Sequence, residues 1–90
     1  MCQVAILVRV LPEDAEIKAE ELYRNIAQAL PDKYKIARYE SEPIAFGLEA
    51  LLLVVLAPEN LEGGTEELEQ ALMGVKGVGQ VDVLRVTRVG

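Results

Sequence analysis

The sequence has 90 residues, of which 51% are hydrophobic and 27% charged, an ordinary balance for one globular domain that excludes wholesale disorder. Its net charge of −6 makes it a poor ligand for nucleic acids and anionic membrane surfaces, because both attract cations. The longest apolar run, residues 50–57, is far shorter than the about 20 residues that a membrane span needs. We therefore expect no direct nucleic-acid contact and no membrane partner.

The rare residue types restrict the chemistry further. The sequence has no histidine, which removes the usual general base and the commonest zinc ligand. Its one cysteine, Cys2, cannot form an internal disulfide, and the start lacks the basic and apolar pattern of a secretory leader. These features predict a cytoplasmic location. They argue against an enzyme and against a bound metal or cofactor.

Four prolines and a glycine pair divide the chain into six segments. In the first, Gln3–Leu11, β-branched residues alternate with period two, which predicts a strand. The second, Glu13–Leu30, is expected to be helical, with its first turn beginning between Asp14 and Ala19. Its apolar stripe comprises Ala19, Leu22, Ile26, Ala29 and Leu30.

The third segment, Lys33–Glu42, alternates but is polar, as expected of a strand at the edge of a sheet. The fourth, Phe46–Ala57, is almost entirely apolar from Ala50 onward. Its β-branched residues and the closing Pro58 favour a central strand over a buried helix.

The fifth segment opens at Gly63-Gly64-Thr65, where Thr65 is a suitable N-cap for a helix that Gly77 would end at C′. Its apolar stripe comprises Leu68, Ala71, Leu72 and Val75. The last segment, Val78–Val89, again predicts a strand.

The order β-α-β-β-α-β predicts an α+β, ferredoxin-like sandwich in a single domain, residues 1–90, with two helices on one face of a four-stranded antiparallel sheet. The first and third strands would be central. Because the third strand is apolar on both sides, one apolar set must lie on the face without helices, and such a patch is typical of a partner surface. The candidate members are Leu52, Val54 and Leu56, or else Leu51, Leu53 and Val55, joined by Leu7 and by Leu84 or Val86.

Several functions of this fold lack their required residues here. A metal carrier needs paired cysteines, and an RNA reader needs aromatic side chains on the sheet. A phosphatase would need a basic anion cradle after the first strand, where this chain has Glu13 and Asp14. The Gly63-Gly64-Thr65 turn lacks the spacing and lysine of a phosphate-binding loop, so we interpret it as a capped turn.

The connection Glu42–Leu48 is unusual because it carries Ile44 and the only phenylalanine, Phe46, next to Gly47, where turns normally favour polar residues. An exposed aromatic residue on a connection is typical of an anchor for a protein pocket. The alternative is that Phe46 folds back and plugs the end of the core.

At this connection the sequence resembles the archaeal elongation factor 1-beta family. The resemblance is carried by Glu42-Pro43-Ile44-Ala45-Phe46-Gly47-Leu48 and by Glu62-Gly63-Gly64-Thr65-Glu66, and it extends from Val10-Leu11-Pro12-Glu13-Asp14 to Arg88-Val89. It implies the same sandwich fold. It also implies a non-enzymatic factor that promotes exchange of GDP for GTP on the GTPase elongation factor 1-alpha.

The resemblance assigns two contacts with that partner. Phe46, framed by Ile44 and Gly47, would dock on the GTPase, and Arg88 would reach its Mg²⁺ and phosphate site. Eukaryotic relatives use lysine at the position of Arg88, and relatives often have lysine where this chain has Glu49. Arg88 is also followed by Val89-Gly90, slightly more than the usual apolar ending.

Two other functions remain compatible with the residues. One is a small-ligand regulatory domain, in which paired sheets bind an amino acid and the Gly77-Val78-Gly79 turn takes part. The other is an interaction module without any link to a GTPase.

Overall fold

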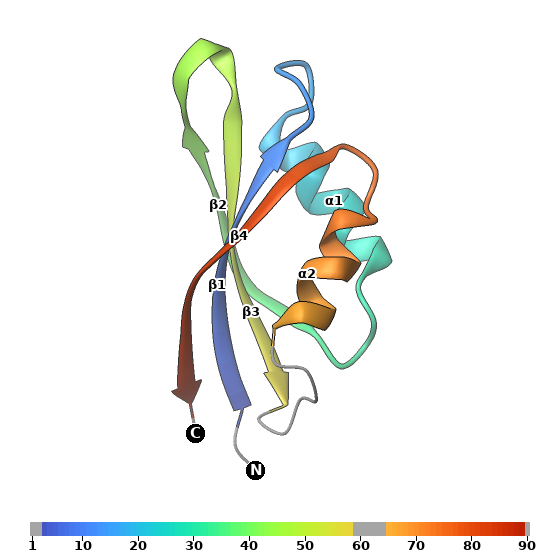
Figure 1. The fold of residues 1–90 in the computed structure, drawn as a ribbon, viewed down its shortest axis with the longest axis vertical. Helices are drawn as coiled ribbons and strands as arrows, with labels where there is room; N and C mark the ends of the chain where they lie inside the picture. The colour runs from blue at the N-terminus through green and yellow to red at the C-terminus, as the bar shows by residue number, and fades with distance from the viewer. Residues whose placement is uncertain (1–2, 59–64, 90) are drawn as a thin grey trace.

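The computed structural model describes residues 3–58 and 65–89, which form one four-stranded sheet and two α-helices (Figure 1). The predicted β-α-β-β-α-β order is confirmed. In chain order the elements are β1 (Gln3–Pro12), α1 (Ala19–Ala29), β2 (Lys35–Pro43), the short 3-10 turn η1 (Ala45–Gly47), β3 (Glu49–Pro58), α2 (Glu66–Met73) and β4 (Val78–Val89).

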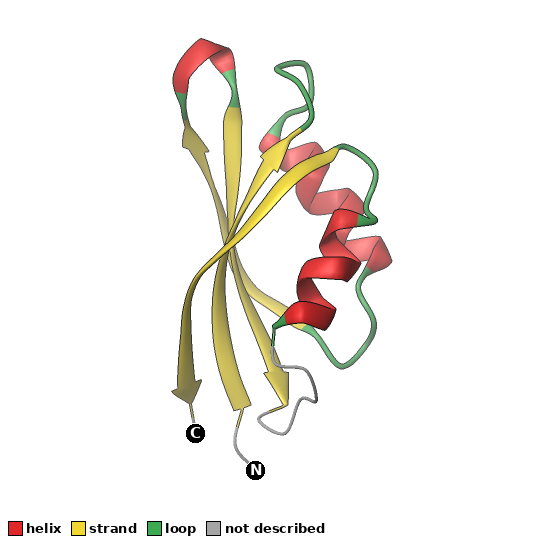
Figure 2. Cartoon of the chain, in the orientation of Figure 1, coloured by secondary structure: helices red, strands yellow, loops and turns green. Residues whose placement is uncertain are grey.

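The strands lie in the order β2-β3-β1-β4, and every neighbouring pair is antiparallel. The prediction that the first and third strands are central and that the polar strand lies at an edge is therefore confirmed. Both helices lie on one side of the sheet, and the other side is uncovered (Figure 2). We call the uncovered side the open face. Neither helix of the described chain has the length and apolarity of a membrane span.

The core lies between the helices and the covered side of the sheet. Alternate residues of the central strands face it, and the alternation follows the period of two that the sequence predicts. Each helix adds its apolar stripe, but Ala29 of the expected α1 stripe is exposed. The largest fully buried side chains are Ile6, Val8, Val10, Leu22, Ile26, Leu51, Leu53, Val55, Leu68 and Leu72.

The first helix begins at Ala19, the late end of the predicted interval. The acidic residues before it form a turn, in which the backbone N–H of Glu16 donates to Oδ1 of Asp14 at 2.9 Å. This local bond competes with a helical turn. The acids that lie in the first turn of the helix are therefore Glu20 and Glu21.

The second helix is shorter than predicted. Thr65 occupies the N-cap position, but its side chain makes no capping hydrogen bond. The expected stop at Gly77 is wrong, because the helix ends at Met73 with Gly74 as its C-cap. Gly77 instead has a φ of +91° in the turn that enters β4, a conformation that glycine adopts without strain.

Three β-bulges alter the edge strands. In β2 the pairing passes from Ile36 opposite Val55 to Arg38 opposite Val54, so Ala37 is the inserted residue. The bulge shifts the alternation that the sequence predicts. In β4 one bulge inserts Leu84, and the other lies at Gly79, where an added Cβ would come within 2.8 Å of the carbonyl oxygen of Pro12.

Candidate partner-binding site

The β2–β3 connection holds its aromatic residue in a strained conformation. The turn is closed by hydrogen bonds in which the N–H of Ile44 donates to the carbonyl of Leu48 at 2.9 Å and the N–H of Leu48 donates to that of Ala45 at 3.3 Å. Phe46 has φ 63° and ψ 28°, the left-handed region that a bulky residue rarely enters. Gly47, with a φ of +77°, completes the reversal.

Phe46 points into solvent and is 92% exposed. The alternative in which it folds back to plug the core is therefore wrong. Ile44 is half-buried and Gly47 is exposed, so the ring stands at the tip with little of the chain around it. An exposed aromatic ring on a fixed turn has the geometry of an anchor for a pocket in another protein.

Arg88, the second residue that the resemblance assigns, lies near the end of β4. It is exposed and lies opposite Val4 of β1, which in turn lies opposite Ala57 of β3. This pairing places Arg88 at the end of the sheet where β1 begins and β3 finishes.

The two assigned residues lie at opposite ends of the molecule. The η1 turn adjoins the pair Pro43 and Glu49, whereas Arg88 is level with Ala57, eight residues farther along β3. At about 3.3 Å per residue, the separation along the sheet is about 26 Å. Figure 1 shows the β2–β3 connection at one end of the long axis and the end of β4 at the other. A partner that contacts both must reach both ends of the sheet.

Glu49 has a structural role that the sequence does not reveal. Its Oε1 accepts a hydrogen bond at 3.3 Å from the N–H of Ala19, the first residue of α1. The N-cap residue Lys18 supplies no side-chain cap, so a carboxylate 30 residues away in the sequence satisfies this helix terminus. Glu49 therefore holds the start of α1 against the base of the β2–β3 connection.

The open face carries the predicted apolar set from β3. Leu52, Val54 and Leu56 are half-buried there, and Leu7 of β1 joins them opposite Val54. The suggestion that Val86 joins this set is wrong, because Val86 lies opposite the core residue Ile6 and so belongs to the helix side. Leu84, the inserted residue of a β4 bulge, is 45% exposed.

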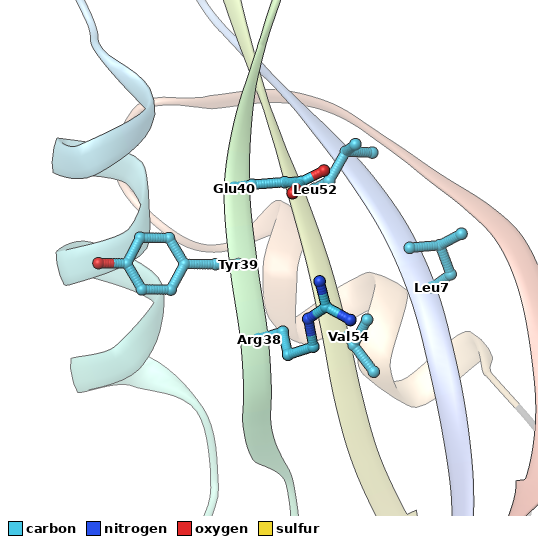
Figure 3. A pocket seen from close by; sticks show the side chains of 6 residues that line it. All are labelled: Leu7, Arg38, Tyr39, Glu40, Leu52 and Val54. Carbon is cyan, nitrogen blue, oxygen red and sulfur yellow. The ribbon is translucent and has the colours of Figure 1, made fainter.

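A stacked tyrosine pair, which the sequence analysis missed, covers the edge of the core between α1 and β2. The rings of Tyr23 and Tyr39 lie 3.8 Å apart between centroids and 13° from parallel. The bulge at Ala37 produces this contact, because it turns Tyr39 toward the helix and leaves Arg38 and Glu40 on the open face (Figure 3).

Residues 3–58 and 65–89 contain no group of three side chains of metal-ligating type. Gly63 and Gly64 of the predicted capped turn, and Cys2, lie outside the described residues.

Comparisons with a family model and with curated proteins identify the same family. Residues 5–89 match the model of the EF-1 guanine nucleotide exchange domain. Similar curated proteins include elongation factor 1-beta of Thermofilum pendens, 66% identical over 88 residues that cover 98% of this chain and 97% of the relative. The elongation factor 1-beta proteins of Staphylothermus marinus and Desulfurococcus amylolyticus are 53% and 52% identical, each over 99% of both chains. The chain therefore belongs to the EF-1 guanine nucleotide exchange family, as one of its archaeal elongation factor 1-beta members.

Proposed function

We propose that this chain promotes exchange of GDP for GTP on elongation factor 1-alpha and acts as one exchange domain over residues 1–90. The proposal is supported by the family match over residues 5–89 and by relatives of nearly the same length. The reaction makes and breaks no covalent bond, so the chain is not an enzyme in that sense and needs no cofactor of its own.

The observation that carries the proposal is the state of Phe46. Its ring is 92% exposed and its backbone is left-handed, although a bulky residue in that region costs on the order of 1 kcal/mol. Neither feature stabilises the free protein. Both are explained if the ring enters a pocket of the GTPase and Ile44 and Gly47 set its position.

Arg88 would act at the opposite end of the same interface. With about 26 Å between the two residues, the GTPase would contact this chain at both ends of its long axis. The guanidinium would approach the site where the GTPase holds Mg²⁺ and the nucleotide phosphates, and there it would compete electrostatically with the ion. Weaker Mg²⁺ coordination loosens the phosphates.

Reciprocal coupling explains why such binding releases nucleotide. If the factor binds the empty GTPase more tightly than the GDP-bound form, GDP must bind the complex more weakly by the same factor. The chain therefore needs contacts that improve when Mg²⁺ and the phosphates leave. A cation at the Mg²⁺ site provides such a contact, whereas the Phe46 anchor holds the GTPase throughout.

The test is release of a fluorescent GDP analogue from the cognate elongation factor 1-alpha, with and without this protein, in the presence of Mg²⁺ and excess GTP. We expect a release rate that rises with protein concentration and then saturates. A double variant, Phe46→Ala with Arg88→Ala, serves as the matched control. A release rate that is the same with wild type, with the control variant and with buffer would refute the proposal.

A further inference from the structure

The strand register sorts the charges of the open face into two parallel rows. Cross-strand partners point to the same side of a sheet, so each row crosses all four strands. The two rows are adjacent, about 7 Å apart along the strands. The first row reads Arg38, Val54, Leu7 and Arg85, and the second reads Glu40, Leu52, Arg9 and Asp82.

The centre of this surface is hollow. A cavity of about 170 Å³ opens over β3 and is lined by Leu7, Leu52, Val54, Arg38, Glu40 and the backbone side of Tyr39. Figure 3 shows Arg38 and Glu40 standing on the same side of the sheet as Leu7, while the Tyr39 ring points away toward α1. The floor is apolar and its rim is charged, which is the composition of a surface that buries another protein.

Three of the four charges at the outer ends of the rows are available for an outside contact. Arg9 already pairs with Glu42 at 3.7 Å, and Asp82 accepts hydrogen bonds from Gln80. Arg38, Glu40 and Arg85 are exposed, and none of them takes part in an ion pair in the described part of the chain.

The open face has almost no net charge, although the chain is strongly acidic. It carries four cations and three carboxylates, which are Arg9, Lys35, Arg38, Arg85, Glu40, Glu42 and Asp82. The net charge of −6 therefore arises from the remaining surface. Two copies that meet through their open faces bring nearly uncharged surfaces together and keep their excess acids apart.

We propose that the open face binds a second copy of this chain, with the two sheets face to face and a two-fold axis across the strands between the rows. Such an axis lays the first row of each copy over the second row of the other. Arg38 then meets Glu40 of the second copy, and Arg85 meets its Asp82. Leu52 of each copy enters the hollow above Val54 of the other.

The other two-fold arrangement of two copies fits the rows less well. A two-fold axis along the strands would place Arg38 over Arg85 of the second copy, where like charges repel. The proposed arrangement pairs opposite charges at the outer ends of both rows in both copies, as an isologous interface requires.

The first test is sedimentation velocity of the purified wild-type chain from about 1 µM to about 1 mM. We expect a reversible shift from 9.9 kDa to twice that mass as concentration rises. A chain that stays monomeric over the whole range overturns the proposal, including the case in which another protein covers this face.

The second test uses charge reversal and fixes the orientation. In Arg38→Glu, two symmetric attractions become two repulsions, and we expect the dimer dissociation constant to rise about 10- to 100-fold. Glu40→Arg should have the same effect. An equimolar mixture of these two variants restores opposite charges at both contacts, so the heterodimer should recover most of the wild-type affinity.

Arg24→Glu is the matched control, because Arg24 is exposed on α1, on the other side of the sheet. Arg24→Glu changes the net charge of the chain by the same amount as Arg38→Glu, and it should leave the dimer dissociation constant unchanged. An equimolar mixture of Arg24→Glu with Glu40→Arg should bind no more tightly than Arg24→Glu alone. Thermal unfolding checks that each variant is folded. The proposal fails if Arg24→Glu weakens the dimer as much as Arg38→Glu, or if the complementary mixture stays monomeric. Neither result affects the exchange proposal, which is measured on the GTPase.

Discussion

At the tip of the β2–β3 connection, Phe46 combines two features that each cost the free protein stability. Its left-handed backbone costs on the order of 1 kcal/mol, and its exposed ring forgoes the about 1.5–3 kcal/mol that burial of such a side chain contributes. A fixed, exposed ring is already in position for binding, so less ordering is needed when a partner docks.

Phe46→Ala should weaken binding to the GTPase by about 1–3 kcal/mol, the loss typical of a buried aromatic anchor. The free energy of unfolding should change little, since the ring makes few contacts within the chain. Calorimetric titration with nucleotide-free elongation factor 1-alpha, together with chemical denaturation, measures both quantities. A variant that is less stable but binds normally would contradict the anchor role.

Arg88→Ala should leave binding to the GTPase nearly intact and slow the stimulated release of GDP by about 30- to 1000-fold. This follows if the guanidinium contact, worth about 2–4 kcal/mol, forms mainly as Mg²⁺ leaves. Arg88→Lys should keep much of the activity, because it keeps the charge. Stopped-flow release with and without a Mg²⁺ chelator is the measurement. The difference between wild type and Arg88→Ala should shrink in chelator, and an undiminished difference would exclude an action through the ion.

The burial of Tyr34 predicts how the stability of the fold depends on pH. It is buried in the core and its hydroxyl has no hydrogen-bond partner in the described residues. Burial raises the pKa of this phenol above its usual value of about 10, the nearby Glu67 carboxylate raises it further, and the ammonium of Lys33 opposes the shift. The unfolded chain therefore releases this proton at a lower pH than the folded chain.

Because the pKa of Tyr34 is higher in the folded chain, it contributes to the free energy of unfolding below about pH 10. This contribution is lost as the pH rises through the pKa of the folded chain. Tyr34→Phe removes this loss, so the variant should be about as stable as wild type at pH 7 and relatively more stable above pH 10. Urea denaturation at a series of pH values measures the difference. If the difference in the free energy of unfolding between wild type and Tyr34→Phe stays constant with pH, the pKa of the phenol does not change on unfolding.

At the scale of elements, α1 depends on a residue of β3 for its start. Lys18 offers no capping acceptor, and the Glu49 carboxylate takes that place at the N–H of Ala19. The same interaction connects the helix to the strand that follows η1. Element boundaries in this chain therefore depend on contacts between distant segments as well as on local sequence.

Glu49→Ala should lower the free energy of unfolding by about 0.5–2 kcal/mol, the range for loss of a helix cap. Glu49→Gln keeps an oxygen acceptor but loses the charge that the helix N-terminus favours, so its loss should be smaller. Denaturation with urea gives both values. Equal stability of wild type and Glu49→Ala would show that water replaces the cap without cost.

For the whole molecule, the sheet acts as a rigid spacer between the two proposed contacts. Phe46 and Arg88 are about 26 Å apart along paired strands and share no neighbour. Changes at such distant sites usually add within about 0.5 kcal/mol.

The double variant Phe46→Ala with Arg88→Ala should therefore lose the sum of the two single losses in the activation free energy of GDP release at low factor concentration. The measurement is a double-mutant cycle, in which GDP release rates are compared for wild type, the two single variants and the double variant well below saturation. A double loss far from the sum would mean that the two ends are coupled, for example by a change in the partner.

The sequence by itself determines the element order, the central and edge strands and the apolar open side of β3. These features follow from local periodicity and from proline breaks, which act over a few residues. It also identifies Ile44, Phe46 and Gly47 as unusual in a connection and, by resemblance, assigns a role to Arg88. The family match supports the resemblance, while the roles of these residues remain predictions.

Only the tertiary structure decides which way Phe46 points, how far it lies from Arg88, and what Glu49 does. It also corrects the side on which Val86 lies, because the register to β1 assigns that residue's face. The bulge at Ala37 moves Tyr39 to the helix side and leaves Arg38 and Glu40 to form part of the two charged rows. A one-residue insertion inverts the alternation that follows it, and nothing in the local pattern marks where it falls. Surfaces built across strands depend on pairing between distant segments, so they appear only when the sheet has formed.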